Sequence, residues 1–389
     1  MHAGERHHDL DNLRALAMLA GVLFHAALAY SPLVHPLFPT ADRQNAAIVD
    51  LVVWFLHLFR MPVFFVVAGF FTALQVERRG MGGMFRSRML RIGLPFLAFV
   101  PLVHLSLTWS TLHAAGTALH PSPLLAWIRM LQEAGPLPPQ PLGTSHLWFL
   151  YYLMLFLVLL WVARCFELGR LGSRIASLHP AWIIGLLPVL LAPALASVSA
   201  PHPAPESIVP QFWALTYYGA FFALGYLMHG HPQFTRRCLR PTLALLAGSL
   251  LLYAGFSVLI AQRPPELAGE SASWPIALIG GAISVWMTLA CLGLGRALLG
   301  RSHRVLRSLA AASYWTYVVH LPILFAIQYW MLDVNLPWTV KFSLSVALTL
   351  AACLLSYQLL VRHTPLARLF GGGWGQQARR TDAPKGIGS

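Results

Sequence analysis

Arg14 and His25 are the first residues in this chain whose type and spacing could support chemistry. They stand eleven positions apart within the apolar stretch 10–30, so on an α-helix they share one face, about 16 Å apart along the axis. An ionisable group inside a bilayer costs about 2.5–3.5 kcal/mol even on a lenient scale. Two such groups on one stripe are therefore expected to line a polar cavity. The alternatives for Arg14 are snorkelling to the headgroups and pairing with Asp11, one turn earlier.

A second polar pair lies in the next apolar stretch, where Arg60 falls near mid-depth and His57 precedes it by one turn. The two side chains can therefore act together. Pro62 removes one backbone donor and can kink the helix beside Arg60. An arginine at this depth needs an anionic or carbonyl partner, or a ligand. Backbone carbonyls freed by Pro62 are the structural alternative.

Further candidates lie where other apolar stretches begin or end. Arg88 and Arg91 are three residues apart, and a guanidinium fork suits phosphate geometry, although on spacing alone an ordinary positive-inside cluster is the preferred interpretation. His146 opens a fourth stretch, while Tyr317 and His320 share one face of a later helix. Each histidine could instead be an interior hydrogen-bonded residue. No zinc-ligand spacing, P-loop or dinucleotide fingerprint is present, so we expect no metal.

The elements that must position these residues are membrane helices. The chain has 389 residues, of which 57% are hydrophobic and 10% charged, whereas a soluble domain carries about 25% charged residues. A membrane span needs about 20 largely apolar residues. This predicts an all-α, polytopic membrane helix bundle of about ten transmembrane helices, at about 13–32, 47–75, 92–111, 146–163, 181–199, 211–229, 242–261, 274–295, 310–331 and 339–361.

The basic residues are distributed unevenly among the loops. The formal net charge is +14, but most Lys and Arg follow the even-numbered spans or lie in the C-terminal tail. The remaining loops hold only Arg43, Arg129 and Arg263. This asymmetry predicts that both termini are cytoplasmic. It favours contact with anionic membrane lipids and argues against a nucleic-acid partner.

We expect one transmembrane domain over residues 1–368, followed by a disordered cytoplasmic tail at 369–389. Between the third and fourth spans, a short helix is predicted from Ser122 as N-cap to Gly135 as the C-terminal stop. The Pro-rich loop at 200–210 could be a rim that meets a substrate, but an ordinary connector is the preferred interpretation.

Five motifs in this order resemble the membrane acyltransferase-3 family over nearly the whole chain. They are LDNLRALAMLAGVLFH, FRMPVFFVVAGFF, FRSRMLRIGLP, SHLWFLYYL and SYWTYVVHLP. Each motif is weak alone, and Ala68-Gly69 stands where many members have Ser-Gly. The combination HLFRMPVFF with SHLWFL is similar to the glucan biosynthesis protein C branch, which is associated with succinylating periplasmic glucans.

The resemblance implies a multi-pass acyltransferase of the bacterial inner membrane, transferring groups other than aminoacyl groups. The donor would be a cytoplasmic acyl-CoA carrying an acetyl or succinyl group, and the acceptor a hydroxyl of an extracytoplasmic glycan. Many members carry a fused periplasmic hydrolase-like domain. This chain ends at 389 without one, so we expect it to complete transfer itself or to use a separate periplasmic transferase.

On that resemblance, roles follow for the candidate residues. His25 would be the general base, or would carry the acyl group transiently, while Asp11 and Arg14 shape the neck for the pantetheine arm. Arg60 would stabilise the oxyanion or bind a succinyl carboxylate. The donor phosphates would be bound by Arg88 and Arg91. The substrate-binding residues would be His57, His146, Tyr317 and His320.

Two other function classes use the same buried charges. A transporter or flippase for a glycan or lipid-linked precursor would use them as a pathway for its cargo. A membrane sensor or scaffold would keep them without any chemistry.

Overall fold

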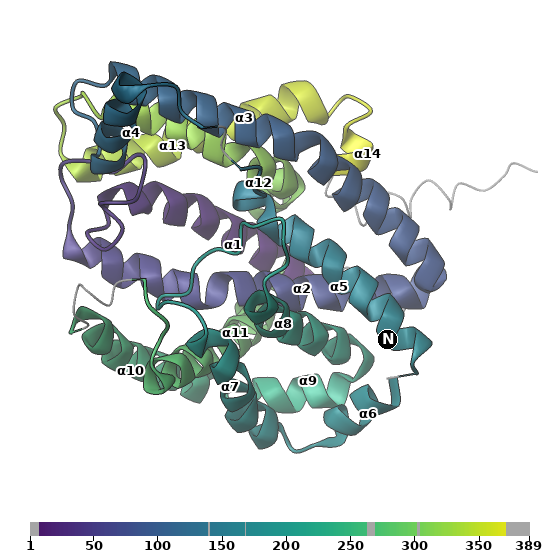
Figure 1. The fold of residues 1–389 in the computed structure, drawn as a ribbon. Helices are drawn as coiled ribbons and strands as arrows, with labels where there is room; N and C mark the ends of the chain where they lie inside the picture. Colours follow the sequence, from purple (N-terminus) through teal and green to yellow (C-terminus); the bar gives the residue numbers. More distant parts are fainter. Residues whose placement is uncertain (1–7, 139–140, 168, 263–268, 302–303, 371–389) are drawn as a thin grey trace, which may run out of the picture.

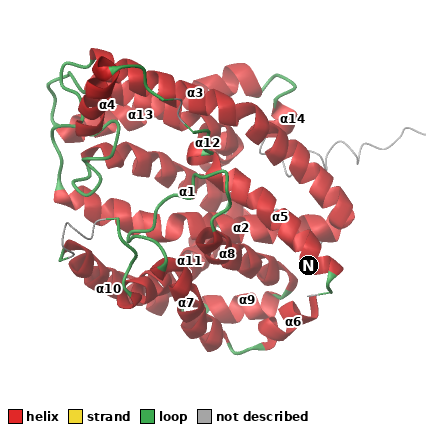
Figure 2. Cartoon of the chain, in the orientation of Figure 1, coloured by secondary structure: helices red, strands yellow, loops and turns green. Residues whose placement is uncertain are grey.

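The structure is a computed structural model that describes residues 8–138, 141–167, 169–262, 269–301 and 304–370. All regular elements in these ranges are helices (Figure 2), which confirms the all-α prediction. The helices are α1 (His8–Ala27), η1 (Leu28–Tyr30), α2 (Ala47–Arg88), η2 (Met89–Gly93), α3 (Leu94–Thr117), α4 (Pro123–Ala134), η3 (Ser145–Leu147), α5 (Trp148–Cys165), α6 (Gly169–Ser177), α7 (Pro180–Ala196), α8 (Phe212–Gly230), α9 (Pro232–Leu239), α10 (Thr242–Ala261), α11 (Trp274–Leu298), α12 (Arg304–Met331), α13 (Trp338–Ser356), η5 (Tyr357–Val361) and α14 (Ala367–Phe370).

Seven helical stretches among the described residues are long and apolar enough to cross a membrane, or eight if the bent pair α6 and α7 is one span. One of them, Ala47–Thr117, is 71 residues long because α2, η2 and α3 follow one another directly. It contains two of the expected spans, and between them α2 is kinked at Gly80, whose φ of 69° and ψ of 172° are not helical. Helix α8 is not among the seven, since its tyrosines and glycines make it less apolar than its Leu-rich neighbours. The count of ten spans is therefore not confirmed.

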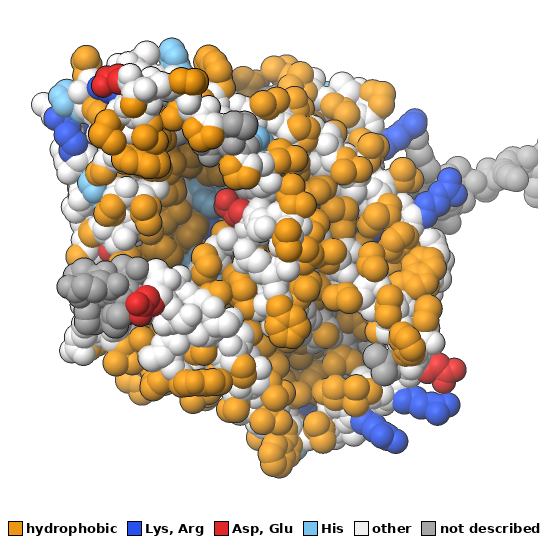
Figure 3. Space-filling model, in the orientation of Figure 1, with side chains coloured by type: hydrophobic (Ala, Val, Ile, Leu, Met, Phe, Trp, Pro, Cys, Tyr) orange, Lys and Arg blue, Asp and Glu red, His pale blue; other side chains and the backbone are white. Residues whose placement is uncertain are grey.

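The outer surface of the bundle is apolar. Leu97, Trp109 and Leu251 are 70%, 69% and 76% exposed, and hydrophobic atoms cover most of the face in Figure 3. Soluble proteins rarely expose such continuous apolar surface, whereas lipid tails can cover it. Together with the long apolar helices, this surface defines a multi-pass membrane protein.

Helices α1 and α2 lie at the centre of the bundle (Figure 1). Helix α1 packs on α12, α2 and α11, and α2 packs most extensively on α8. On one side lie α3, α12 and α13, and on the other α7, α8, α10 and α11. The two stretches that carry the first polar pairs are therefore surrounded by other helices.

One end of the bundle is rich in arginine. We call it the arginine-rich end, where residues 78–91, 164–174 and 367–370 lie, at the right of Figure 1. Lys and Arg side chains lie along this edge in Figure 3. Helix α14 also lies here and buries Phe370, so Leu369 and Phe370, which the sequence placed in the tail, belong to the folded bundle. Residues 371–389 of that expected tail lie outside the described residues.

Two glycines allow α2 and α8 to touch backbone to backbone. A Cβ added at Gly69 would lie 2.0 Å from the carbonyl oxygen of Phe222. A Cβ added at Gly225 would lie 1.9 Å from the carbonyl oxygen of Val66. No side-chain rotation relieves a clash with a carbonyl, so any larger residue must separate the helices.

We therefore expect Gly225→Ala to lower the free energy of unfolding by about 3 kcal/mol or more, at or above the upper end of overpacking effects. Thermal unfolding of the detergent-solubilised protein measures this. Gly255→Ala on α10 is the matched control, because nothing lies within 4 Å of a Cβ added there. Equal stability of the two variants would contradict the close approach of α2 and α8.

Candidate active site

A cavity of about 230 Å³ lies inside the bundle, lined by α1, α2, α5, α12, α14 and the segment 201–211. The site residues predicted from the sequence that line it are Arg14, His25, His57, Arg60, Arg88, Arg91, His146, Tyr317 and His320. Asp11 does not line the cavity, but pairs with Arg14 at 3.6 Å. The structure therefore brings nine of the ten candidate residues together in one cavity.

The face of α1 that carries Arg14 and His25 turns inward along its length. Met18 and Gly21 line the cavity between them, as expected for positions on one helical stripe. The Arg14 side chain is 20% exposed, and its Nη2 donates to the carbonyl oxygen of Ala310 on α12. Arg14 therefore lines the cavity instead of snorkelling to the headgroups.

Arg60 is a buried cation without an acidic partner among the described residues. It is 7% exposed, and its guanidinium carbon lies 4.2 Å from the centre of the Phe24 ring. Its Nη1 has no hydrogen-bond partner, and no hydrogen bond to the carbonyls near Pro62 is formed. A cation–π contact offsets only part of the desolvation cost. Arg60 is therefore arranged to receive an anion or a polarised carbonyl oxygen.

Three imidazoles have one ring nitrogen held by a backbone carbonyl. His57 Nε2 lies 2.7 Å from the oxygen of His202. His146 Nε2 and His320 Nδ1 lie 3.1 Å and 2.8 Å from the oxygen of Tyr317. Because a carbonyl only accepts, these nitrogens carry the proton. The other nitrogen of each neutral ring is an acceptor, and within the described chain it is buried without a partner.

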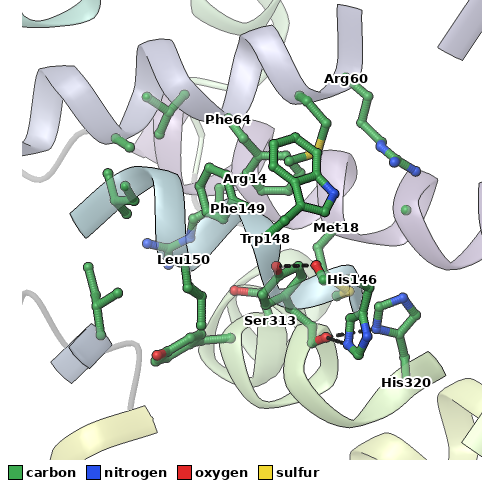
Figure 4. Close-up of a pocket in the computed structure, with 18 of the residues that line it drawn as sticks. Arg14, Met18, Arg60, Phe64, His146, Trp148, Phe149, Leu150, Ser313 and His320 are labelled. Carbon is green, nitrogen blue, oxygen red and sulfur yellow. Dashed lines mark hydrogen bonds between the residues drawn. The ribbon is translucent and has the colours of Figure 1, made fainter. Parts of the chain in front are cut away.

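The imidazole of His25 differs from these three. Its ring centre lies 5.3 Å from that of His320, which in turn lies 5.0 Å from that of His146 (Figure 4). No residue that the structure describes forms a hydrogen bond with His25. Either of its ring nitrogens can therefore accept a proton from a molecule in the cavity.

The arginine-rich end of the cavity is organised around Arg88. Its Nε donates to Gln75 Oε1 at 2.8 Å, and its Nη2 to Thr72 Oγ1 at 3.3 Å. Arg91 lies one turn later on η2, a π-helical turn, a feature found often at functional sites. Phe370 of α14 also lines this end. The pair is thus placed where a polyanionic group could enter.

Sequence reasoning missed the contribution of segment 201–211. His202 is 4% exposed and lies between His57 and Tyr218, with its Nε2 3.2 Å from the Tyr218 hydroxyl. Burial lowers the pKa of His202, so its ring is neutral. His202 itself does not line the cavity, but Glu206 of the same segment does. In the sequence, only a histidine and an acid within a Pro-rich connector indicated that this segment reaches the site.

Within the described ranges, no group of three or more His, Cys, Asp or Glu residues could hold a metal ion. His57, His146 and His320 instead each direct one ring nitrogen at a backbone carbonyl.

The apolar helices and the buried polar cavity are those of a membrane protein with an internal site, and the comparisons with known proteins give its class. A family model described as an acyltransferase domain matches residues 7–358. The chain belongs to this family, the membrane acyltransferase-3 family, and the protein is an acyltransferase.

Among its relatives are the proteins named glucans biosynthesis protein C. Those of Salmonella heidelberg (strain SL476) and Salmonella typhi are each 26% identical over 394 residues, which is 94% of this chain and 95% of theirs. That of Salmonella schwarzengrund (strain CVM19633) is 25% identical over the same length. No solved structure shows a significant match.

Proposed function

We propose that the protein transfers an acetyl or succinyl group from a cytoplasmic acyl-CoA to a hydroxyl of an extracytoplasmic glycan, such as a periplasmic glucan. Membership of the acyltransferase family and the glucan-biosynthesis relatives support this. The observation that carries it is the cavity, in which Arg60, whose Nη1 has no hydrogen-bond partner, and His25 lie between an arginine-rich end and a histidine-rich wall.

The proposal includes a bacterial inner-membrane location with both termini in the cytoplasm. The arginine-rich end would then face the cytoplasm, in line with the positive-inside rule. The segment 201–211 and the start of α5 would lie toward the periplasm. Donor and acceptor would reach the cavity from opposite sides.

The donor would enter from the arginine-rich end. Arg88 and Arg91 would bind its phosphates, because guanidinium groups match phosphate geometry. The ion pair of Arg14 with Asp11 would form the neck that the pantetheine arm passes. His25 lies about 16 Å further along the α1 axis, where the thioester would arrive.

His25 would then accept the proton of the acceptor hydroxyl while the oxygen of that hydroxyl attacks the thioester carbonyl carbon. The electrons of the thioester carbonyl move onto the carbonyl oxygen, beside the guanidinium of Arg60. When the carbonyl re-forms, the carbon–sulfur bond breaks and the thiolate takes the proton from His25. If His25 carries the acyl group transiently, a ring nitrogen first attacks the thioester carbon, the carbon–sulfur bond breaks, and the thiolate takes the proton of the other ring nitrogen. The acceptor oxygen then attacks the acyl carbon, the carbon–nitrogen bond breaks, and the hydroxyl proton returns to the imidazole.

The acceptor would be held by His57, His146, Tyr317 and His320. Three of these side chains are imidazoles with an unused acceptor nitrogen. Sugar hydroxyls supply the donors that these nitrogens lack.

The test is reconstitution of the purified protein in vesicles, with acyl-CoA on one side and a soluble glucose oligosaccharide on the other. Mass spectrometry then measures acyl mass added to the oligosaccharide, alongside CoA release. Transport of unmodified oligosaccharide without CoA release would instead identify a flippase. CoA release with no mass added would point to hand-over to a separate periplasmic transferase.

We expect Arg91→Gln to raise the KM for acyl-CoA about tenfold or more, because a charge-assisted hydrogen bond contributes about 1.5–3 kcal/mol. The KM for the oligosaccharide should not change. Arg91 is a cleaner probe than Arg88, whose guanidinium also holds Gln75 and Thr72. Arg236→Gln on α9, outside the cavity, is the control. An unchanged donor KM in Arg91→Gln would remove this residue from the donor site.

A further inference from the structure

The segment 201–211 is held rigidly against the start of α5. The backbone nitrogen and the Oγ1 of Thr144 both donate to the carbonyl oxygen of Glu206, at 2.8 and 2.9 Å. The hydroxyl of Tyr151 donates to the carbonyl oxygen of Ile208 at 2.6 Å. These hydrogen bonds fix the backbone of Glu206 and therefore the point from which its side chain extends.

Glu206 is the one acid among the described residues that line the cavity. Its backbone oxygen is used by Thr144, but its carboxylate forms no hydrogen bond or ion pair within the described chain. Glu206 is an exposed residue. The backbone of Glu206 is fixed and its carboxylate has no partner among the described residues, so the carboxylate is available to a ligand.

The side chains of Glu206 and of three histidines that line the cavity accept hydrogen bonds, and this determines which class of ligand fits. The free nitrogens of His57, His146 and His320 are acceptors in the neutral rings, and an ionised carboxylate only accepts. A ligand that satisfies the wall must carry several donors close together. A polyhydroxyl molecule meets this condition, whereas an anion would meet lone pairs and a negative charge.

We propose that Glu206 is the residue that selects the acyl acceptor, by accepting hydrogen bonds from two neighbouring hydroxyl groups of one sugar ring. The inference rests on the proposed function and adds to it a specificity residue and a requirement for a vicinal diol. The carboxylate takes part in no bond-making step. It holds the ring so that a further hydroxyl faces His25.

The experiment compares Glu206→Gln and Glu206→Ala with wild-type protein, using the acyl-CoA and glucose-oligosaccharide assay. Glu206→Ala should raise the KM for the oligosaccharide between about tenfold and a hundredfold, as expected for hydrogen bonds to a charged group. Glu206→Gln keeps one acceptor oxygen and should have a smaller effect. The KM for acyl-CoA should not change in either variant. Glu133→Gln on α4 is the matched control, since Glu133 is exposed and does not line the cavity.

A second acceptor separates recognition from general damage. With a short primary alcohol, which has one hydroxyl, the Glu206 variants should transfer the acyl group as fast as wild type. An unchanged oligosaccharide KM in Glu206→Ala would overturn the inference, as would an equal loss with the simple alcohol. If wild-type protein transfers no acyl group to either acceptor, the proposed function itself fails, which is a different result.

Discussion

Replacing His25 with alanine should abolish detectable acyl transfer while the protein stays folded. A general base contributes about 10²- to 10⁴-fold to the rate, and a covalent acyl carrier would contribute at least as much. The side chain forms no hydrogen bond within the described chain, so its removal breaks no bond that holds the bundle together. CoA release and acyl mass on the oligosaccharide measure the loss, and thermal unfolding in detergent checks the fold.

Two companion variants make this result specific. His25→Gln keeps a hydrogen-bonding side chain without a basic nitrogen, so it should be as inactive as His25→Ala. His104→Ala on α3 removes a histidine outside the cavity and should keep wild-type turnover. Wild-type turnover in His25→Ala would end the assignment and would leave His320, whose Nε2 also lacks a partner, as the next candidate base.

The clustering on α1 could be predicted because it depends on local geometry. Helical periodicity alone places Arg14 and His25 on one face, and the cost of burying charge turns that face inward. The ends of α4 were predictable for a similar reason. The hydroxyl of Ser122 accepts from the backbone nitrogen of Leu125, and the helix stops at Gly135. In each case the cause lies within a few residues of the effect.

The surroundings of Arg60 could not be predicted, because they depend on how α1 packs on α2. Phe24 is 36 positions earlier in the sequence, and only the packed bundle brings its ring to 4.2 Å from the guanidinium carbon. The sequence left backbone carbonyls near Pro62 as the less favoured alternative. The structure decides between them, since no such hydrogen bond is formed.

The segment 201–211 was misjudged for the same kind of reason. Its composition is that of a connector, and the hydrogen bonds that hold it come from residues such as Thr144, 62 positions away from Glu206. The span count is not confirmed for a different reason. Hydropathy marks two separate apolar peaks in 47–117, whereas the structure joins them in one helical stretch that is kinked at Gly80.

Replacing Arg60 with methionine should have opposite effects on activity and stability. Loss of a group that stabilises a developing oxyanion costs about 10²- to 10³-fold in turnover. The resting protein, however, buries this cation without an acid or a hydrogen bond from the described residues. The desolvation penalty is several kcal/mol per ion, whereas the contact with Phe24 returns about 2 kcal/mol. Arg60→Met should therefore unfold at the same temperature as wild type or at a higher one.

Arg129→Met provides the comparison of opposite sign. The guanidinium of Arg129 donates to the carbonyl oxygens of Ala115 and Ala118, both at 2.6 Å, and so closes the end of α3. Its loss should lower the unfolding temperature and leave turnover nearly unchanged, because Arg129 does not line the cavity. If Arg60→Met lost stability as Arg129→Met does, Arg60 would be a structural arginine. The site would then lack its group for the oxyanion, because Arg60 is the cation beside Phe24 and His57 where the thioester would lie.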